Sequence, residues 1–221
     1  MVGLYKRGVS EIRLIENEEW HCKIDEVKKI IKKISQGLAG MNFSRWSPDS
    51  RRILTVCEFN IRLNIWSLID KSIMTINYPK YSDRGLSFTN NGYFMALAER
   101  REAKDFIGIY YVGDFSLINH FSVETQDLND LTWTKDDTCI IVWDNCLECK
   151  FLVYSPTGNI LATHNPYELT LGIKGVTLSP NGHYLSVGYY DEVCRLYNHL
   201  SWKLIMDFEH VHSITDTNNI V

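Results

Sequence analysis

Two cysteines, Cys146 and Cys149, stand two residues apart, a spacing that zinc sites and redox-active dithiols share. A tetrahedral zinc site needs two more ligands, and the sequence has no second Cys-x-x-Cys and no His-x-x-x-His. The nearest following histidine, His164, has no second histidine at ligand spacing. We therefore expect small, buried thiols here rather than a metal site or a redox centre.

His210 and His212 form a second candidate ligand pair, because residues i and i+2 of a strand share one face. Two ligands alone make a weak metal site. We therefore predict that these are surface histidines.

Acidic pairs suggest a third kind of chemistry, general acid–base catalysis. The pairs are Asp136 with Asp137 and Asp127 with Asp130. Both occur in turn contexts, where Asp is favoured because its side chain bonds the nearby backbone. No separately placed nucleophile and no glycine-rich phosphate-binding loop accompanies them. The sequence therefore predicts neither a catalytic site nor a bound cofactor.

The segments that carry these residues repeat along the chain. WSPDS at 46–50 is a turn sequence followed by an apolar run. Its counterparts occur at successive steps of 42, 45 and 45 residues, measured from the Ser or Thr of each turn. They are FTNNG at 88–92, WTKDD at 133–137 and LSPNG at 178–182, aligned on Ser47, Thr89, Thr134 and Ser179.

An aromatic marker runs in parallel with these turns, each time after an Ile, Val or Leu. The steps between successive markers are 44, 44 and 43 residues. Two independent markers with one period indicate a true repeat. The marker residues are Trp66, Tyr110, Tyr154 and Tyr197.

Each repeat contains the signals of about four short strands. An apolar run such as RILTV or TCIIVW follows the turn, then come a polar break, a strand ending at the marker, and a last strand such as KLIMDF. Four strands in about 44 residues indicate one blade of a β-propeller, which must stack on its neighbours to bury both faces. In this arrangement Trp46 packs between blades, and Trp133 is its counterpart in the third blade.

The predicted fold is therefore an all-β propeller of about four complete four-stranded blades plus a partial one. Four blades lie at the lower limit for ring closure, so an open arc is possible and the chain is expected to be part of a longer propeller or a short version of one. The predicted ranges are a partial blade at 1–26, a basic connection at 27–40, and blades at 41–80, 81–125, 126–170 and 171–215, within 41–221.

The basic connection contains a short amphipathic helix in residues 27–35. Its apolar side is formed by Val27 and three isoleucines. Its basic side could attract an acidic surface, or its apolar side could cap the open face of a blade with the lysines in water. We favour the second interpretation because a nine-residue helix is marginal alone. The candidate partner-binding lysines are Lys28, Lys29, Lys32 and Lys33.

MALAERR at 95–101 ends in three charged residues, which we expect to leave a strand and enter a loop. Such loops gather on one face of a propeller, and Arg is frequent in interfaces. Glu99, Arg100 and Arg101 are therefore candidate partner-binding residues. In the alternative interpretation, they pair with one another in a solvated turn.

Bulk composition limits the possible partners and compartments. The net charge is −4, which does not favour nucleic acid as a partner. No apolar run reaches the ~18–20 residues of a membrane span, and the start has no secretory signal pattern. Six cysteines in a non-secreted chain suggest reduced, mostly buried thiols and a cytoplasmic protein.

The repeats resemble WD repeats, whose third strand ends in Trp-Asp or a degenerate equivalent. Here the aromatic is kept and the Asp is lost, and most repeats lack the family's Gly-His dipeptide. Asp191 stands where the family places the Asp of the tight turn between the second and third strands.

Several stretches resemble a centrosomal and spindle-pole branch of the WD-repeat family, over nearly the whole chain and apparently as an internal portion of a longer protein. The resemblance implies a scaffold of the microtubule-organising centre that anchors microtubules, organises spindles and supports cilium assembly. It also implies a coiled-coil partner of the SSX2-interacting protein type, within a microtubule-associated complex. The pattern departs at 27–40, so the basic connection is not a feature of that branch. The stretches are EEWHCKIDE at 18–26, MALAERR at 95–101, TQDL at 125–128, VWDNCLE at 142–148 and LGIKGV at 171–176.

Two other classes of function remain open. Degenerate WD repeats also occur in adaptors of ubiquitin ligases and RNA-processing complexes, whose copurifying subunits would identify them. A propeller enzyme would carry polar or metal-binding side chains from several blades around its axis, and the varied connections between blades share no such ligand residue.

Overall fold

The computed structural model describes residues 3–5, 12–14, 41–70, 72–165 and 172–209. The basic connection with its four lysines and the His210/His212 pair lie outside the described residues. In the described part, no helix is both long and apolar enough to cross a membrane.

Four antiparallel four-stranded sheets follow one another along the chain, and each is one propeller blade. This confirms the prediction of four complete blades. Blade 1 contains β3 (Met41–Trp46), β4 (Arg52–Cys57), β5 (Arg62–Ser67) and β6 (Ile73–Asn77). Blade 2 contains β7 (Leu86–Phe88), β8 (Phe94–Arg101), β9 (Lys104–Tyr111) and β10 (Leu117–Ser122). Blade 3 contains β11 (Leu128–Trp133), β12 (Ile140–Asp144), β13 (Phe151–Tyr154) and β14 (Ile160–His164), and blade 4 contains β15 (Ile173–Leu178), β16 (Tyr184–Tyr189), β17 (Val193–Asn198) and β18 (Leu204–Glu209).

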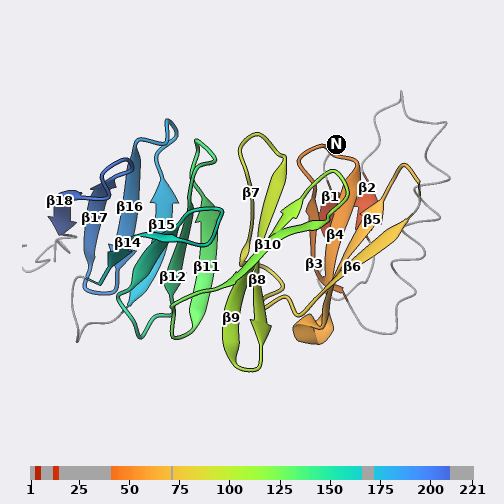
Figure 1. Cartoon of the computed structure of the whole chain (residues 1–221), viewed down its shortest axis with the longest axis horizontal. Coiled ribbons are helices and arrows are strands. Elements are labelled where there is room, and N and C mark those ends of the chain that lie inside the picture. Colours follow the sequence, from red (N-terminus) through yellow and green to blue (C-terminus); the bar gives the residue numbers. More distant parts are fainter. Residues whose placement is uncertain (1–2, 6–11, 15–40, 71, 166–171, 210–221) are drawn as a thin grey trace, which may run out of the picture.

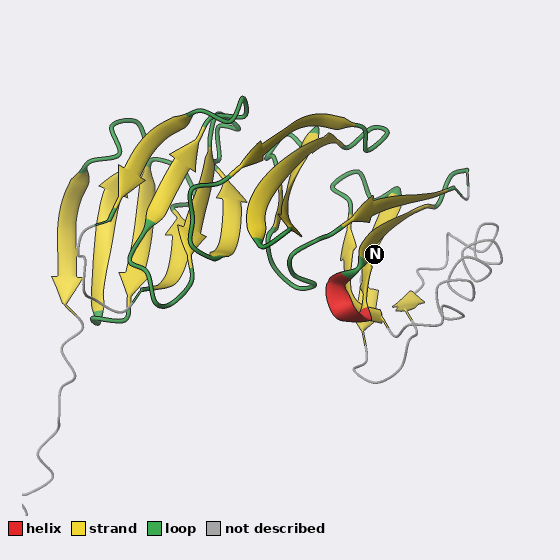
Figure 2. Cartoon of the chain, turned by 60° about the horizontal axis from the view of Figure 1, so that its bottom comes forward, coloured by secondary structure: helices red, strands yellow, loops and turns green. Residues whose placement is uncertain are grey.

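The blades lie side by side in chain order and form an open arc, with blades 1 and 4 at opposite ends (Figures 1 and 2). A separate two-stranded sheet, β1 (Gly3–Tyr5) with β2 (Ile12–Leu14), lies within the range predicted for the partial blade. A short 3-10 helix, η2 (Glu58–Asn60), connects β4 to β5 at one end of blade 1.

The repeated turn between the first two strands of each blade has the same hydrogen bonds every time. In blade 2, Thr89 donates its backbone N–H to Phe94 O, and its hydroxyl oxygen accepts the Phe94 N–H at 2.9 Å. The fourth residue of the turn has a positive φ, which explains Gly at this position in two of the four turns. The residues with positive φ are Ser50, Gly92, Asp137 and Gly182.

The alternation of side chains along each strand builds the contacts between blades. In β12, Ile140 and Val142 face blade 2, whereas Ile141 and Trp143 face blade 4. All four are nearly inaccessible to solvent. Each blade therefore has an aliphatic or aromatic face on both sides, as a stack of sheets requires.

The two tryptophans at the turns differ in their surroundings. Trp133 is buried between blades 2 and 3, as expected. Trp46 packs on the face of blade 1 that points away from blade 2, against Ile53, Trp66 and Leu68.

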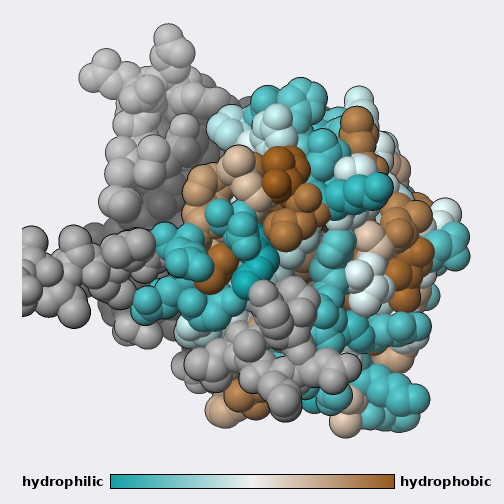
Figure 3. Space-filling model, turned by 90° about the vertical axis from the view of Figure 1, so that its left-hand side faces the viewer, coloured by the Kyte–Doolittle hydropathy of each residue, from teal (hydrophilic) through white to brown (hydrophobic). Residues whose placement is uncertain are grey.

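Among the described residues, no element packs on the face of blade 4 that points away from blade 3, which is called the open face. Two residues of β18, Met206 and Phe208, are 46% and 53% exposed there. Figure 3 views the molecule from this end and shows apolar residues between hydrophilic ones on its surface.

Candidate functional site

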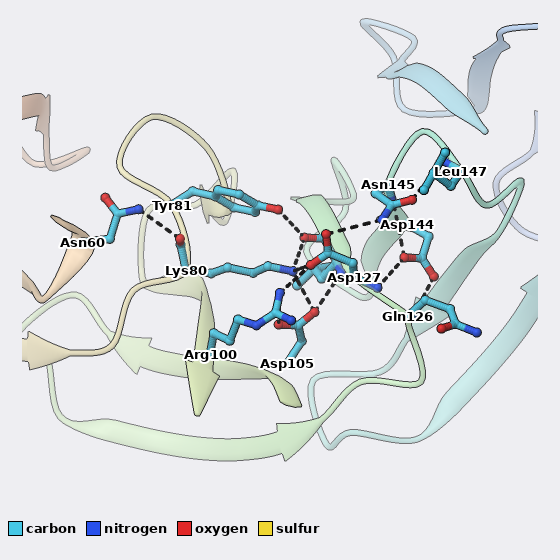
Figure 4. A network of polar contacts seen from close by, with 11 residues as sticks. Asn60, Lys80, Tyr81, Arg100, Asp105, Gln126, Asp127, Asp144, Asn145 and Leu147 are labelled. Atoms are coloured by element: carbon cyan, nitrogen blue, oxygen red, sulfur yellow. Dashed lines mark hydrogen bonds and ion pairs between the residues drawn. The ribbon is translucent and has the colours of Figure 1, made fainter. Parts of the chain in front are cut away.

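The most extensive polar cluster in the described residues lies where blades 1, 2 and 3 meet, around the ammonium group of Lys80 (Figure 4). Lys80 lies in the connection between β6 and β7, and its side chain is 3% exposed. Its Nζ donates to Asp105 Oδ2 at 2.7 Å, to Asp127 Oδ1 at 2.7 Å and to Leu128 O at 2.6 Å. The three donors of the ammonium group thus all reach acceptors, two of them in blade 3.

The carboxylate of Asp105 connects blade 2 to blade 3 in a second way. It stands near the start of β9, and its Oδ2 also accepts the backbone N–H of Leu128 at 2.8 Å. Arg100 Nη1 lies 3.8 Å from its other oxygen. The charge of this buried aspartate is therefore compensated by one lysine and one arginine, as burial of a carboxylate requires.

Asp127 occupies the more exposed side of the cluster. It accepts hydrogen bonds from Lys80, from Arg100 at 2.5 Å and from Asn145 Nδ2 at 3.3 Å. The bond from Lys80, with the smaller effects of Arg100 and Asn145, lowers the pKa of Asp127 to about 2 against the opposing effect of burial.

Asp144 continues the cluster into blade 3 and is fully buried at the end of β12. Its carboxylate accepts the backbone N–H groups of Gln126, Asp127 and Asn145 at 2.8, 2.7 and 3.1 Å. It therefore holds the connection that leads from blade 2 into β11. On the other side, Asn60 of blade 1 donates its side-chain amide to Lys80 O at 3.1 Å.

A second buried carboxylate, Glu99, lies within blade 2. It accepts hydrogen bonds from the Tyr110 hydroxyl at 2.5 Å and from Arg101 Nη2 at 2.7 Å, and His120 Nε2 lies 3.3 Å away. Burial, followed by the hydrogen bond to Glu99, raises the pKa of the Tyr110 phenol well above its ordinary value. A Cβ at Gly108 would stand 2.5 Å from Glu99 Oε1 and 2.7 Å from the Tyr110 ring, so only glycine leaves room for this arrangement.

The placement of the three charged residues after MALA needs correction. We expected a loop, but β8 continues to Arg101, and Glu99, Arg100 and Arg101 pair with Phe106, Asp105 and Lys104 of β9. The expectation failed because a tight turn at Glu102 and Ala103, both with positive φ, prolongs the hairpin. Glu99 is fully buried, whereas the side chains of Arg100 and Arg101 are 41% and 45% exposed. The prediction of a partner contact is therefore kept for the two arginines alone.

The aromatic marker of each repeat has a different polar partner. The Trp66 indole donates to Thr55 Oγ1 at 2.9 Å, and the Tyr110 hydroxyl donates to Glu99. The hydroxyl of Tyr154 accepts the backbone N–H of Glu124 at 2.9 Å, and that of Tyr197 lies 3.2 Å from the Tyr189 hydroxyl. Asp191 occupies the tight turn between β16 and β17, where it accepts the Val193 N–H at 3.0 Å and pairs with Arg195 at 2.9 Å.

The cysteines and aspartates considered as candidate metal, redox or acid–base residues lie in different surroundings. Cys149 is buried between blades 3 and 4, but Cys146 is exposed in the turn after β12, which corrects the expectation of a buried thiol there. Asp136 and Asp137 lie in a turn, whereas Asp130 lies within β11. Within the described ranges, no three His, Cys, Asp or Glu side chains are grouped closely enough to hold a metal ion.

The cluster around Lys80 can fasten blades together, because it joins opposite charges and backbone groups from three blades. The sequence alone does not reveal this cluster: Lys80 stands in no motif, and Asp127 has the context of a turn residue. One signal was available, since Lys80, Asp105 and Asp127 all fall near the polar connections of the repeat. The pairing itself depends on distances between blades.

Comparison with known proteins gives two relatives. The chain is 42% identical over all of its 221 residues to WD repeat-containing protein WRAP73 from Mus musculus, of which it covers 46%. It is 22% identical over 178 residues, or 78% of the chain, to an uncharacterised WD repeat-containing protein from Schizosaccharomyces pombe, of which it covers 37%. The chain thus spans less than half the length of these curated relatives. No family model matches it.

Proposed function

Because this chain is built from the four-stranded blades of a WD-repeat β-propeller, we propose that it is a non-catalytic scaffold that holds a protein partner at the microtubule-organising centre. The single observation that carries the proposal is the likeness to WRAP73 over the whole chain, which supports a WD-repeat role in protein interaction. The proposed location is the centrosome or spindle pole. There the scaffold would support microtubule anchoring, spindle organisation and cilium assembly.

The structure supports a scaffold through the packing and hydrogen bonds between its blades. Apolar clusters lie between successive blades, and the Lys80 cluster adds charged and backbone hydrogen bonds across three of them. Such a body presents its loops in fixed positions, which lowers the entropy cost of binding. The proposed partner is a coiled-coil protein of the SSX2-interacting type.

The test is copurification of the tagged protein with that coiled-coil protein, together with its location in dividing cells. We expect stoichiometric copurification and a signal at centrosomes or spindle poles. Copurification of ubiquitin-ligase or RNA-processing subunits instead, or absence from the poles, would overturn the proposal.

A further inference from the structure

Four aromatic residues of the described chain have a left-handed backbone, which is strained for bulky side chains. They are Phe59, Tyr78, Phe115 and Trp202, with φ of 68°, 63°, 54° and 55°. Phe115 and Trp202 are 4% and 9% exposed and pack in the clusters between blades, so burial offsets their strain. Phe59 and Tyr78 are 84% and 55% exposed, so burial of their side chains does not offset their strain in the same way.

The two exposed aromatics belong to one surface. Phe59 lies in η2, and two residues later the carbonyl of Ile61, which is 55% exposed, accepts the backbone N–H of Tyr78 at 3.1 Å. The neighbouring Asn60 is joined to the same segment through Lys80 O. In Figure 1, η2 of blade 1 and the turn between β8 and β9 of blade 2 both lie along the lower edge of the molecule. Phe59, Ile61, Tyr78 and Arg101 are called the rim patch below.

Arg101 gives the rim patch its charge. Its guanidinium carbon lies 5.4 Å from the centre of the Tyr78 ring, and its side chain is 45% exposed. The ion pair with Glu99 and the stacking on Tyr78 hold it in position. The other donors of its guanidinium have no hydrogen-bond partner among the described residues and are available to a carboxylate. Exposed Arg62 and Lys104 stand at the adjoining strand ends, whereas the acidic residues Glu58 and Glu102 lie in η2 and in the β8–β9 turn.

We propose that the rim patch is the docking site for an acidic amphipathic helix, with apolar side chains on Phe59, Ile61 and Tyr78 and carboxylates on Arg101 and the flanking cations. This proposal rests on the proposed function, because a coiled-coil protein offers such helices. Exposed aromatic residues beside an arginine are the usual anchors of an interface. The left-handed backbone at Phe59 is held by the surrounding structure, and such strained residues cluster at ligand-binding sites.

The probe is a fluorescent peptide that forms a single amphipathic helix, too short to pair as a coiled coil, with leucine along one face and glutamate beside it. It is titrated with the protein and followed by anisotropy. Phe59→Ala and Arg101→Glu should each weaken binding about tenfold or more, as loss of an interface anchor does. Leu200→Ala is the matched control: Leu200 is 82% exposed, but it lies in the turn between β17 and β18. The affinity of Leu200→Ala for the peptide should stay within about twofold of that of the unsubstituted protein.

Phe59→Gly separates a binding role from a structural one. Glycine adopts a positive φ at no steric cost, so the variant should melt at the same or a higher temperature. It should nevertheless bind the peptide about tenfold more weakly. A variant that binds normally would overturn the rim patch as the docking site while leaving the proposed function intact.

Two further outcomes are decisive. A peptide with the same glutamates and serine in place of leucine should not bind; equal binding would reduce the interaction to charge attraction and overturn the proposal. If the original protein fails to bind the leucine peptide at all, the proposal also falls. That result alone would leave the proposed function standing, because copurification and location in dividing cells test it separately.

Discussion

One face of blade 1 packs against blade 2, and the equivalent face of blade 4 points away from blade 3. The two faces are built from equivalent positions but have different surroundings. In blade 1, Ile65 pairs with Met74 and Leu63 pairs with Ile76, and all four pack against blade 2. The equivalent pairs of blade 4 are Leu196 with Met206 and Cys194 with Phe208. Ile76 is 8% exposed, whereas Phe208 is 53% exposed.

The comparison shows that an apolar pattern does not by itself reveal whether a face is covered. The two faces have similar side chains in their third and fourth strands. A covered face has a neighbouring blade packed on it, and between blades 2 and 3 polar groups such as Lys80, Asp105 and Asp127 also meet in fixed geometry. Closed and open faces should therefore respond differently to the same substitution.

Truncation of a phenylalanine gives the largest expected contrast. Phe151 is fully buried between blades 3 and 4, where its ring lies 4.5 Å from that of His164 and 5.1 Å from that of Tyr197. Phe151→Ala should lower the free energy of unfolding by roughly 3–5 kcal/mol, as for other large-to-small changes in a core. Phe208→Ala on the open face should cost less than about 1 kcal/mol. Urea unfolding measures both, and equal losses would show that the open face is covered in solution.

Removal of the Lys80 ammonium group tests the polar part of the closed region. Lys80→Met leaves the buried Asp105 without its main cation, and we expect a loss of about 3 kcal/mol. Arg100→Met is the matched control in the same cluster. Because the side chain of Arg100 is 41% exposed, its loss should cost less than about 1 kcal/mol. A small effect of Lys80→Met would mean that the cluster does not fasten the blades.

A methyl group added at two strand glycines tests packing at a finer scale. Gly108→Ala places a Cβ against the Glu99 carboxylate and the Tyr110 ring and should cost about 1–3 kcal/mol. Gly175 lies in β15 with nothing within 4 Å of an added Cβ, so Gly175→Ala should be neutral or slightly stabilising. Thermal melting of the two variants measures the difference, and a similar shift for both would contradict the crowding inferred around Gly108.

The sequence predicted the fold well because a propeller repeats its local signals. The turns after Trp46 and Trp133, the marker at Tyr110 and the alternation in β12 are all set within one repeat, so period and pattern locate the strands. The prediction of where β8 ends was wrong, also for a local reason. Two residues with left-handed backbone, Glu102 and Ala103, continue the hairpin where the charged residues suggested a loop.

The polar cluster and the rim patch could not be predicted in the same way. Lys80 and Asp127 are 47 residues apart, and their contact depends on how far one blade is rotated from the next. The exposure of Phe59 likewise depends on its backbone conformation, which has no pattern in the sequence. Interactions within a repeat follow from composition, whereas interactions between repeats require the geometry of the stack.

The smallest expected effect is a pH dependence confined to the closed interface of blades 3 and 4. His164 stacks there on Phe151, and burial lowers its pKa below the ordinary value of about 6.5. His164 therefore binds a proton less readily in the folded protein than in the unfolded chain. Its contribution to the free energy of unfolding is complete above about pH 7 and is lost as the pH falls below about 6.5. His164→Phe, which keeps the ring contact, should flatten the free energy of unfolding between about pH 7 and pH 5. A slope that stays the same in His164→Phe would place the titrating group outside this interface.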